Sequence, residues 1–189
     1  MGTALWISLG VVVVLVVLLV LYLWVSYTSL VTLRTRVDEA WRDISVQLEQ
    51  RAELLPQLVT AVHGYADHES AAFDAVTSAR EESITATTPA EATVAENHVQ
   101  QALKSVFAIS ESFPQLQSSP SFLQLQADLG ESGERIQASR RFYNGGVREL
   151  NTKIQVFPNS LFARRAGASR REFFEAADVA RAEPPRVQF

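Results

Sequence analysis

An uninterrupted apolar run, ALWISLGVVVVLVVLLVLYLWV at residues 4–25, constrains this chain more than any other feature. The run contains no charged residue, and a helix of this length would span roughly 33 Å at about 1.5 Å per residue. That length crosses a bilayer hydrocarbon core of about 30 Å. Aromatic residues typical of membrane interfaces flank it: Trp6 at one end and Tyr22, Trp24 and Tyr27 at the other. We therefore expect residues 1–26 to form a short tail and a transmembrane helix.

A cleaved signal peptide is the rival interpretation of this run, and it fits less well. No Lys or Arg precedes the run, the run exceeds a typical signal-peptide core, and no small-x-small cleavage site follows it. The nearest basic residues, Arg34, Arg36 and Arg42, lie on the C-terminal side. Because basic residues favour the cytoplasmic side, we expect a single pass through the cell (inner) membrane, with the short N-terminus outside and the remainder in the cytoplasm.

Helical spacing dominates the first part of the remaining chain, and no strand-like alternation stands out. The apolar positions recur mostly at steps of three, four or seven: Leu30, Val37, Trp41, Ile44, Leu48, Leu55, Leu58, Val62 and Tyr65. No Gly or Pro lies between Val25 and Leu55, so the membrane helix is expected to continue into this one. The chain then either kinks or reverses at Pro56, or it reverses at residues 64–68, where Gly64 can end a helix and Asp67 can cap the next.

Two later helix starts carry a capping signal. Thr88-Pro89-Ala90-Glu91 combines a capping hydroxyl, a proline at the first helical position and a glutamate at the third. The apolar steps that follow predict a helix that ends by Pro114. Ser119-Pro120 repeats the same cap-then-proline order and predicts the start of the last long helix.

That last long helix is expected to end at Pro158. Its apolar stripe comprises Phe122, Leu125, Leu129, Ile136, Tyr143, Val147, Leu150, Ile154 and Phe157. The Gly145-Gly146 pair should weaken it by about 1 kcal/mol per glycine relative to alanine. Ser169 with Glu172 then predicts the cap of a short final helix through Phe174.

These patterns predict an all-α protein. An N-terminal transmembrane helix precedes an antiparallel bundle of long helices, because several amphipathic helices joined by short loops must bury matching stripes. We assign residues 27–178 to the bundle and residues 179–189, which contain Pro184-Pro185, to an extended tail.

Charge is distributed unevenly along the chain. The formal net charge is −4, but residues 34–134 carry −10 and residues 135–189 carry +6. Such asymmetry indicates either pairing between complementary helices or a basic end that faces an anionic surface. The chain contains no cysteine, which excludes disulfides and thiolate chemistry.

No pattern of catalytic or metal-binding residues emerges. His63 and His68 are five residues apart and diverge by about 140° on a helix, whereas helical zinc sites use spacings of three or four. The remaining histidine, His98, has no matching ligand motif, and the chain lacks Glu-x-x-His, a phosphate-binding glycine loop and G-x-S-x-G. We therefore expect no catalytic residue, metal, cofactor or small-molecule substrate.

The segment LFARRAGASRREFF, residues 161–174, is the candidate contact surface. It interleaves bulky apolar and basic residues: Leu161, Phe162, Arg164, Arg165, Arg170, Arg171, Phe173 and Phe174. Such a mixture suits a membrane interface, where each arginine near an anionic surface contributes about 1 kcal/mol. The alternative is that the phenylalanines dock on the bundle and the arginines pair with its acidic helices. Nucleic acid is not expected as a partner because the domain as a whole is acidic.

Several long stretches resemble the LemA family. YTSLVTLRTRVDEAWRDISVQLEQRAELLPQLVTAVHGYADHE (residues 27–69) resembles the opening of its members, and RRFYNGGVRELNTKIQVFPNSLFARRAG (residues 140–167) resembles their second hallmark. FFE at residues 173–175 and the closing PPRVQF resemble their C-terminus. The chain departs from the family at Gly145-Gly146, Leu150 and Gly167-Ala168, where larger or aromatic residues are usual.

The resemblance implies a short extracytoplasmic N-terminus, one membrane helix and a LemA-like four-helix bundle. It brings no catalytic residues, and one branch of the family is associated with building magnetosome membranes. The leading hypothesis is thus a non-enzymatic bacterial scaffold that binds copies of itself, other envelope proteins or the membrane. Direct binding of anionic lipid by residues 161–174 is the alternative, and an enzyme or metal protein is the third.

Overall fold

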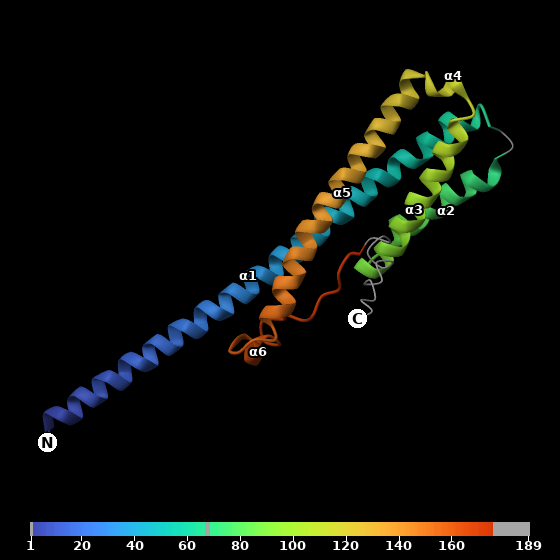
Figure 1. Ribbon diagram of the computed structural model, residues 1–189. Coiled ribbons are helices and arrows are strands. Elements are labelled where there is room, and N and C mark those ends of the chain that lie inside the picture. Colours follow the sequence, from blue (N-terminus) through green and yellow to red (C-terminus); the bar gives the residue numbers. More distant parts are fainter. Residues whose placement is uncertain (1, 67–68, 176–189) are drawn as a thin grey trace, which may run out of the picture. The chain divides into compact units, whose positions relative to one another are not determined.

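The computed structural model describes residues 2–66 and 69–175, and within these ranges every regular element is an α-helix (Figure 1). The helices are α1 (Gly2–His63), α2 (Ser70–Thr85), α3 (Pro89–Ser110), α4 (Pro114–Gln117), α5 (Pro120–Lys153) and α6 (Asn159–Phe162). The all-α prediction is confirmed. The predicted tail, residues 179–189, lies outside the described residues.

The chain divides into two compact units, each made of two stretches. The first unit comprises Met1–Glu39 and Gly145–Arg171, and the second comprises Ala40–Asn144 and Glu172–Phe189. The long helices α1 and α5 contribute residues to both.

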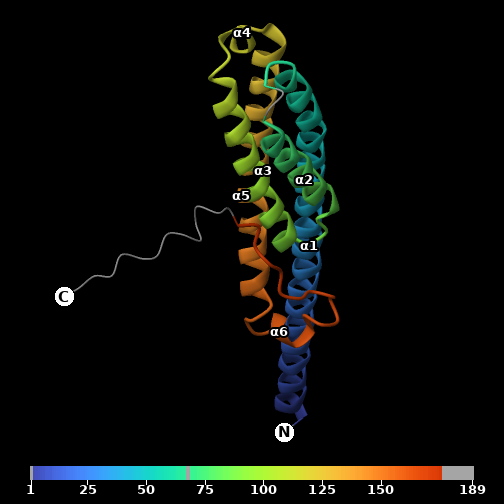
Figure 2. The same ribbon diagram turned by 90° about the vertical axis from the view of Figure 1, so that its right-hand side faces the viewer.

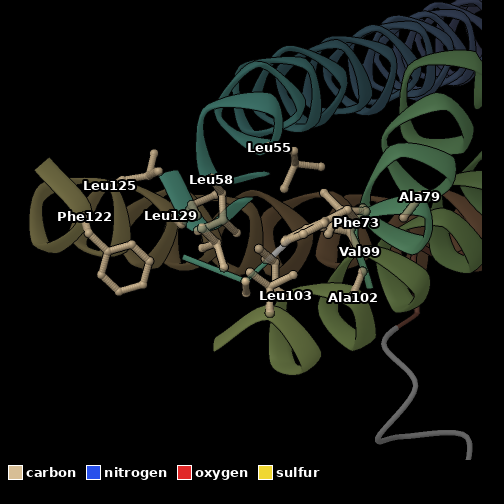
Figure 3. Packing of buried hydrophobic residues seen from close by; sticks show 14 of the residues in the cluster. Leu55, Leu58, Phe73, Ala79, Val99, Ala102, Leu103, Phe122, Leu125 and Leu129 are labelled. Carbon is tan, nitrogen blue, oxygen red and sulfur yellow. The ribbon is translucent and has the colours of Figure 1, made fainter. Parts of the chain in front are cut away.

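The second unit is a four-helix arrangement in which the chain runs out along α1, returns along α2, runs out along α3 and returns along α5 (Figure 2). Its core draws apolar side chains from all four helices (Figure 3). These include Leu55, Leu58, Phe73, Ala79, Val99, Ala102, Leu103, Phe122, Leu125 and Leu129. Antiparallel packing follows because each helix has an apolar stripe that only its neighbours can cover.

Pro56 neither ends nor reverses α1, which remains helical to His63. A proline has no amide hydrogen, so Pro56 cannot donate to the carbonyl of Ala52 four residues earlier. The side chain of Arg80 on α2 takes that place, since its Nε donates to the Ala52 carbonyl at 3.1 Å. The reversal comes instead after His63, as one alternative predicted, and the proposed cap Asp67 lies outside the described residues.

The predicted capping box opens α3. Thr88 Oγ1 accepts from the Glu91 amide at 3.2 Å, and Glu91 Oε2 accepts from the Thr88 amide at 3.1 Å and the Thr87 amide at 2.9 Å. These hydrogen bonds, first those from Thr87 and then those from Thr88, lower the pKa of the Glu91 carboxyl. The start of α5 at Pro120 is also confirmed.

In the first unit, α1 carries both an exposed apolar stretch and a buried stripe. Along residues 9–22 the described side chains are exposed, and α1 is long and apolar enough to cross a membrane. From Leu30 onward the stripe is buried and faces α5. At Gly146 the two helices approach so closely that a Cβ would lie 3.1 Å from Val37 Cγ2. Gly146, expected only as a weak point of the helix, therefore permits this close packing.

Candidate membrane-proximal site

The segment from the last residue of α5 to Ala166 contacts α1 just past the C-terminal end of its apolar run. Lys153 Nζ donates to Ser29 Oγ at 2.8 Å. In α6, the ring of Phe162 meets the ring of Tyr27 edge-on, with centroids 6.5 Å apart. Both contacts fall within four residues of the end of the apolar run, so this segment lies beside the first turn of α1 that follows the run.

Arg34 holds the end of this segment. Its Nη1 donates to the carbonyl of Ala166 at 3.2 Å, and its Nε lies 3.6 Å from Asp38 Oδ2. The next residue, Gly167, has φ +62°, a conformation that favours glycine. A Cβ there would also collide with the Arg34 guanidinium. Glycine is therefore favoured here by the backbone conformation, and a larger residue would also have to displace the Arg34 guanidinium.

Arg171 is fixed to the first unit by its backbone and its side chain. The amide group of Asn151 donates to the Arg171 carbonyl at 2.8 Å and accepts from the Arg171 amide at 2.9 Å. The Arg171 guanidinium donates to Asp38 Oδ1 at 2.5 Å. At this position, the basic C-terminal part of the chain is paired internally with the acidic part.

Phe174 docks in the second unit. Its side chain is buried and meets the indole of Trp41 with centroids 6.1 Å apart, and Trp41 in turn contacts the ring of Tyr143 at 5.5 Å. The Asn144 amide exchanges two hydrogen bonds with the Phe174 backbone, at 2.9 and 3.0 Å. The Tyr143 hydroxyl donates to the Glu172 carbonyl at 2.9 Å.

The predicted short helix capped by Ser169 and Glu172 is wrong, because residues 168–175 contain no regular element. Side-chain amides of Asn144 and Asn151 bond the backbone groups of residues 174 and 171. A helix would need the same backbone groups for its own bonds, so these tertiary bonds hold the segment extended and override the local capping signal.

The predicted contact surface is thus divided. Four of its eight residues are wholly or partly covered: Phe162, Arg171, Phe173 and Phe174. Four are exposed: Leu161, Arg164, Arg165 and Arg170. The predicted interface aromatics Trp6, Tyr22 and Trp24 are exposed as well.

Two exposed apolar residues near this surface were not predicted. The last long helix was expected to end at Pro158 with Phe157 on its buried stripe, but α5 ends at Lys153 and both Val156 and Phe157 are exposed. The sequence does indicate that Phe157 is not helical, because Pro158 restricts the residue before it and disfavours helix there.

A buried ion pair occupies the second unit away from this surface. Arg51 Nη1 donates to Glu96 Oε1 at 2.5 Å, and Gln100 Nε2 donates to the same oxygen at 2.8 Å. Arg51 Nε and Glu96 Oε2 are buried without a hydrogen-bond partner. The three residues line an open groove of about 520 Å³, whose opposite wall on α5 includes Gly130 and Gly133. The spacing of apolar residues in the sequence did not predict this buried pair.

The described histidines lie in unrelated surroundings. His98 Nδ1 lies 2.5 Å from Glu82 Oε2, and the ring of His63 contacts that of Phe73 with centroids 5.4 Å apart. His68 lies outside the described residues. In the part of the chain that the structure describes, no group of three or more His, Cys, Asp or Glu side chains is placed to hold a metal ion.

Comparison with known proteins identifies one family. The model of the LemA family matches residues 40–189. No curated protein matches the chain.

Proposed function

Because this chain belongs to the LemA family, we propose that it is a non-enzymatic, single-pass membrane protein whose helical bundle acts as a scaffold or interaction module at the cytoplasmic membrane. The continuity of α1 supports this most. The same helix supplies the exposed apolar stretch and, from Leu30, the buried stripe that packs against the following helices. Any partner bound by the helices is thereby tethered to the membrane.

In this proposal the partners are copies of the same chain or other envelope proteins, and neither nucleic acid nor a small-molecule substrate is involved. Trp6, Tyr22, Trp24 and Tyr27 lie at the two membrane interfaces. Arg34 and its neighbouring arginines keep the helical part in the cytoplasm, so the short N-terminus faces outward.

Cross-linking of the full-length protein in its native membrane tests the binding role. We expect cross-linked species larger than one chain, in which the protein is joined to copies of itself or to other envelope proteins. Truncation of the apolar run should abolish them, because loss of the anchor removes the local concentration at the membrane. A protein that stays monomeric and uncoupled in the membrane at its native abundance contradicts the proposal.

A second candidate function is direct binding of anionic lipid headgroups by the basic C-terminal segment. The exposure of Arg164, Arg165 and Arg170 favours it, whereas Arg171 is already paired with Asp38. Native mass spectrometry of the detergent-solubilised protein can count bound anionic lipids. We expect fewer after the three exposed arginines are changed to glutamine, and no loss after the control Arg135→Gln. Equal counts in both variants would remove this candidate.

A further inference from the structure

Three exposed apolar side chains lie close together in sequence just after α5, in the first unit. Val156, Phe157 and Leu161 are 53%, 75% and 70% exposed. Their values are as high as those of the apolar run of α1, where most side chains are a little over half exposed. Large apolar side chains this exposed, and this close together in sequence, indicate a surface that another apolar phase covers.

The contacts of neighbouring residues fix the height of these side chains along α1. Phe162 contacts Tyr27, and Lys153 contacts Ser29. Tyr27 and Ser29 are two and four residues beyond Val25, which corresponds to about 3 and 6 Å along a helix axis. The polar interface adds roughly 5–7 Å to each side of the hydrocarbon core. The segment that carries Val156, Phe157 and Leu161 therefore lies at the level of the interface if residues 4–25 span the membrane.

We propose that Val156, Phe157 and Leu161 insert into the bilayer interface beside α1 and form a second membrane contact. This inference rests on the proposed membrane anchoring. The apolar side chains would enter the boundary between headgroups and acyl chains, as those of interfacial helices do. The contact would restrict rotation and tilt of α1 relative to the bilayer, because it adds a second attachment to one side of the helix.

The charges around these residues identify lipid as the occupant. From Leu150 to Arg171 the sequence contains Lys153, Arg164, Arg165, Arg170 and Arg171 and no acidic residue. Arg164 and Arg165 are exposed and lie within four residues of Leu161. Cationic side chains beside an apolar patch match a lipid surface, whose phosphates lie directly above its acyl chains. The segment that carries these residues also contacts α1 just past its apolar run, through Phe162 on Tyr27 and Lys153 on Ser29.

Depth-dependent quenching tests this inference on the full-length protein. The chain has no cysteine, so Phe157→Cys and Leu161→Cys each give one labelling site for the fluorophore NBD. The labelled proteins are reconstituted in phosphatidylcholine–phosphatidylglycerol vesicles that contain doxyl lipids labelled either near the headgroup or deep in the chain. Val25→Cys reports the anchor, and Leu123→Cys is the matched control, an exposed leucine of α5 in the second unit.

We expect the labels at 157 and 161 to show blue-shifted emission and loss of fluorescence with the shallow quencher. The label at 25 should also be quenched, and the label at 123 should not. Quenching at 25 without quenching at 157 and 161 overturns the inference and leaves the anchor in place. Absence of quenching at all four sites overturns the anchor and the inference together. A blue shift at 157 and 161 without quenching assigns the patch to a protein partner and also overturns the inference.

Discussion

Removing one member of the buried Arg51–Glu96 pair should destabilise the second unit strongly, whereas removing both should not. The two side chains are each only 6% exposed. In Arg51→Met, Glu96 keeps one hydrogen bond, from Gln100, and loses its cationic partner. Breaking a buried ion pair in this way costs about 3–5 kcal/mol, because an uncompensated charge remains. The mechanism is therefore desolvation of the remaining carboxylate rather than loss of a favourable bond.

The double variant Arg51→Met/Glu96→Leu separates this mechanism from simple loss of packing. Arg51 Nε and Glu96 Oε2 already lack partners, so the pair does not recover the full cost of its own burial. Apolar side chains of similar size should restore stability to that of the parent chain or raise it by about 1–4 kcal/mol.

Urea unfolding of the detergent-solubilised full-length protein, followed by circular dichroism, gives the free energies. Arg135→Met is the matched control, because Arg135 and Glu131 form a pair at 2.6 Å whose side chains are 56% and 60% exposed. That exposed pair should contribute at most about 1 kcal/mol. An Arg51→Met variant as mild as the control, or a double variant as unstable as Arg51→Met, would refute this mechanism.

Three further predictions concern backbone conformation, pH and packing. Gly167→Ala should destabilise the first unit by at least about 1–2 kcal/mol, because of its positive φ and the Arg34 side chain. The control Gly145→Ala, with open space around its Cβ, should stabilise by up to about 1 kcal/mol; equal effects in urea unfolding would contradict this account. Folding lowers the pKa of Glu91 below its ordinary 4.5, so its contribution is present above that pH and is lost as pH falls through the lowered value. The stability difference between the parent chain and Glu91→Gln should accordingly shrink on acidification, and a difference constant with pH would argue against it. Trp41→Ala should cost about 3 kcal/mol, the low end for a large core residue, since its ring is only half-buried; a near-neutral result in the same assay would place the ring outside the core.

The sequence predicted the features that depend on local chemistry. The capping box at Thr88 and the proline start of α5 follow from hydrogen bonds made within one turn, and the structure has both. The buried stripe of α1 follows from helical period, although Trp41 is only half-buried and Tyr65, two residues past the end of α1, is exposed. These features could be predicted because the residues that determine each of them lie within a few positions of it.

Features that depend on residues distant in the sequence could not be predicted in this way. Pro56 left two outcomes open. Arg80 compensates for its missing donor inside a continuous helix, through a bond to the carbonyl of Ala52, which is 28 residues from Arg80. The extended segment around Arg171 and Phe174 depends on Asn151 and Asn144, which no local pattern marks as tertiary partners. The exposed Phe157 was misassigned because the apolar stripe was extended past the end of α5.

The topology of the full-length protein in its native membrane tests the central claim most directly. Thr3→Cys and Ser112→Cys, in the otherwise cysteine-free chain, can be treated with a membrane-impermeant maleimide before and after permeabilisation. We expect position 3 to be labelled in intact cells and position 112 only after permeabilisation. Alkaline carbonate should leave the protein in the membrane pellet. Release by carbonate, or labelling of both positions from the same side, would contradict a single-pass anchor.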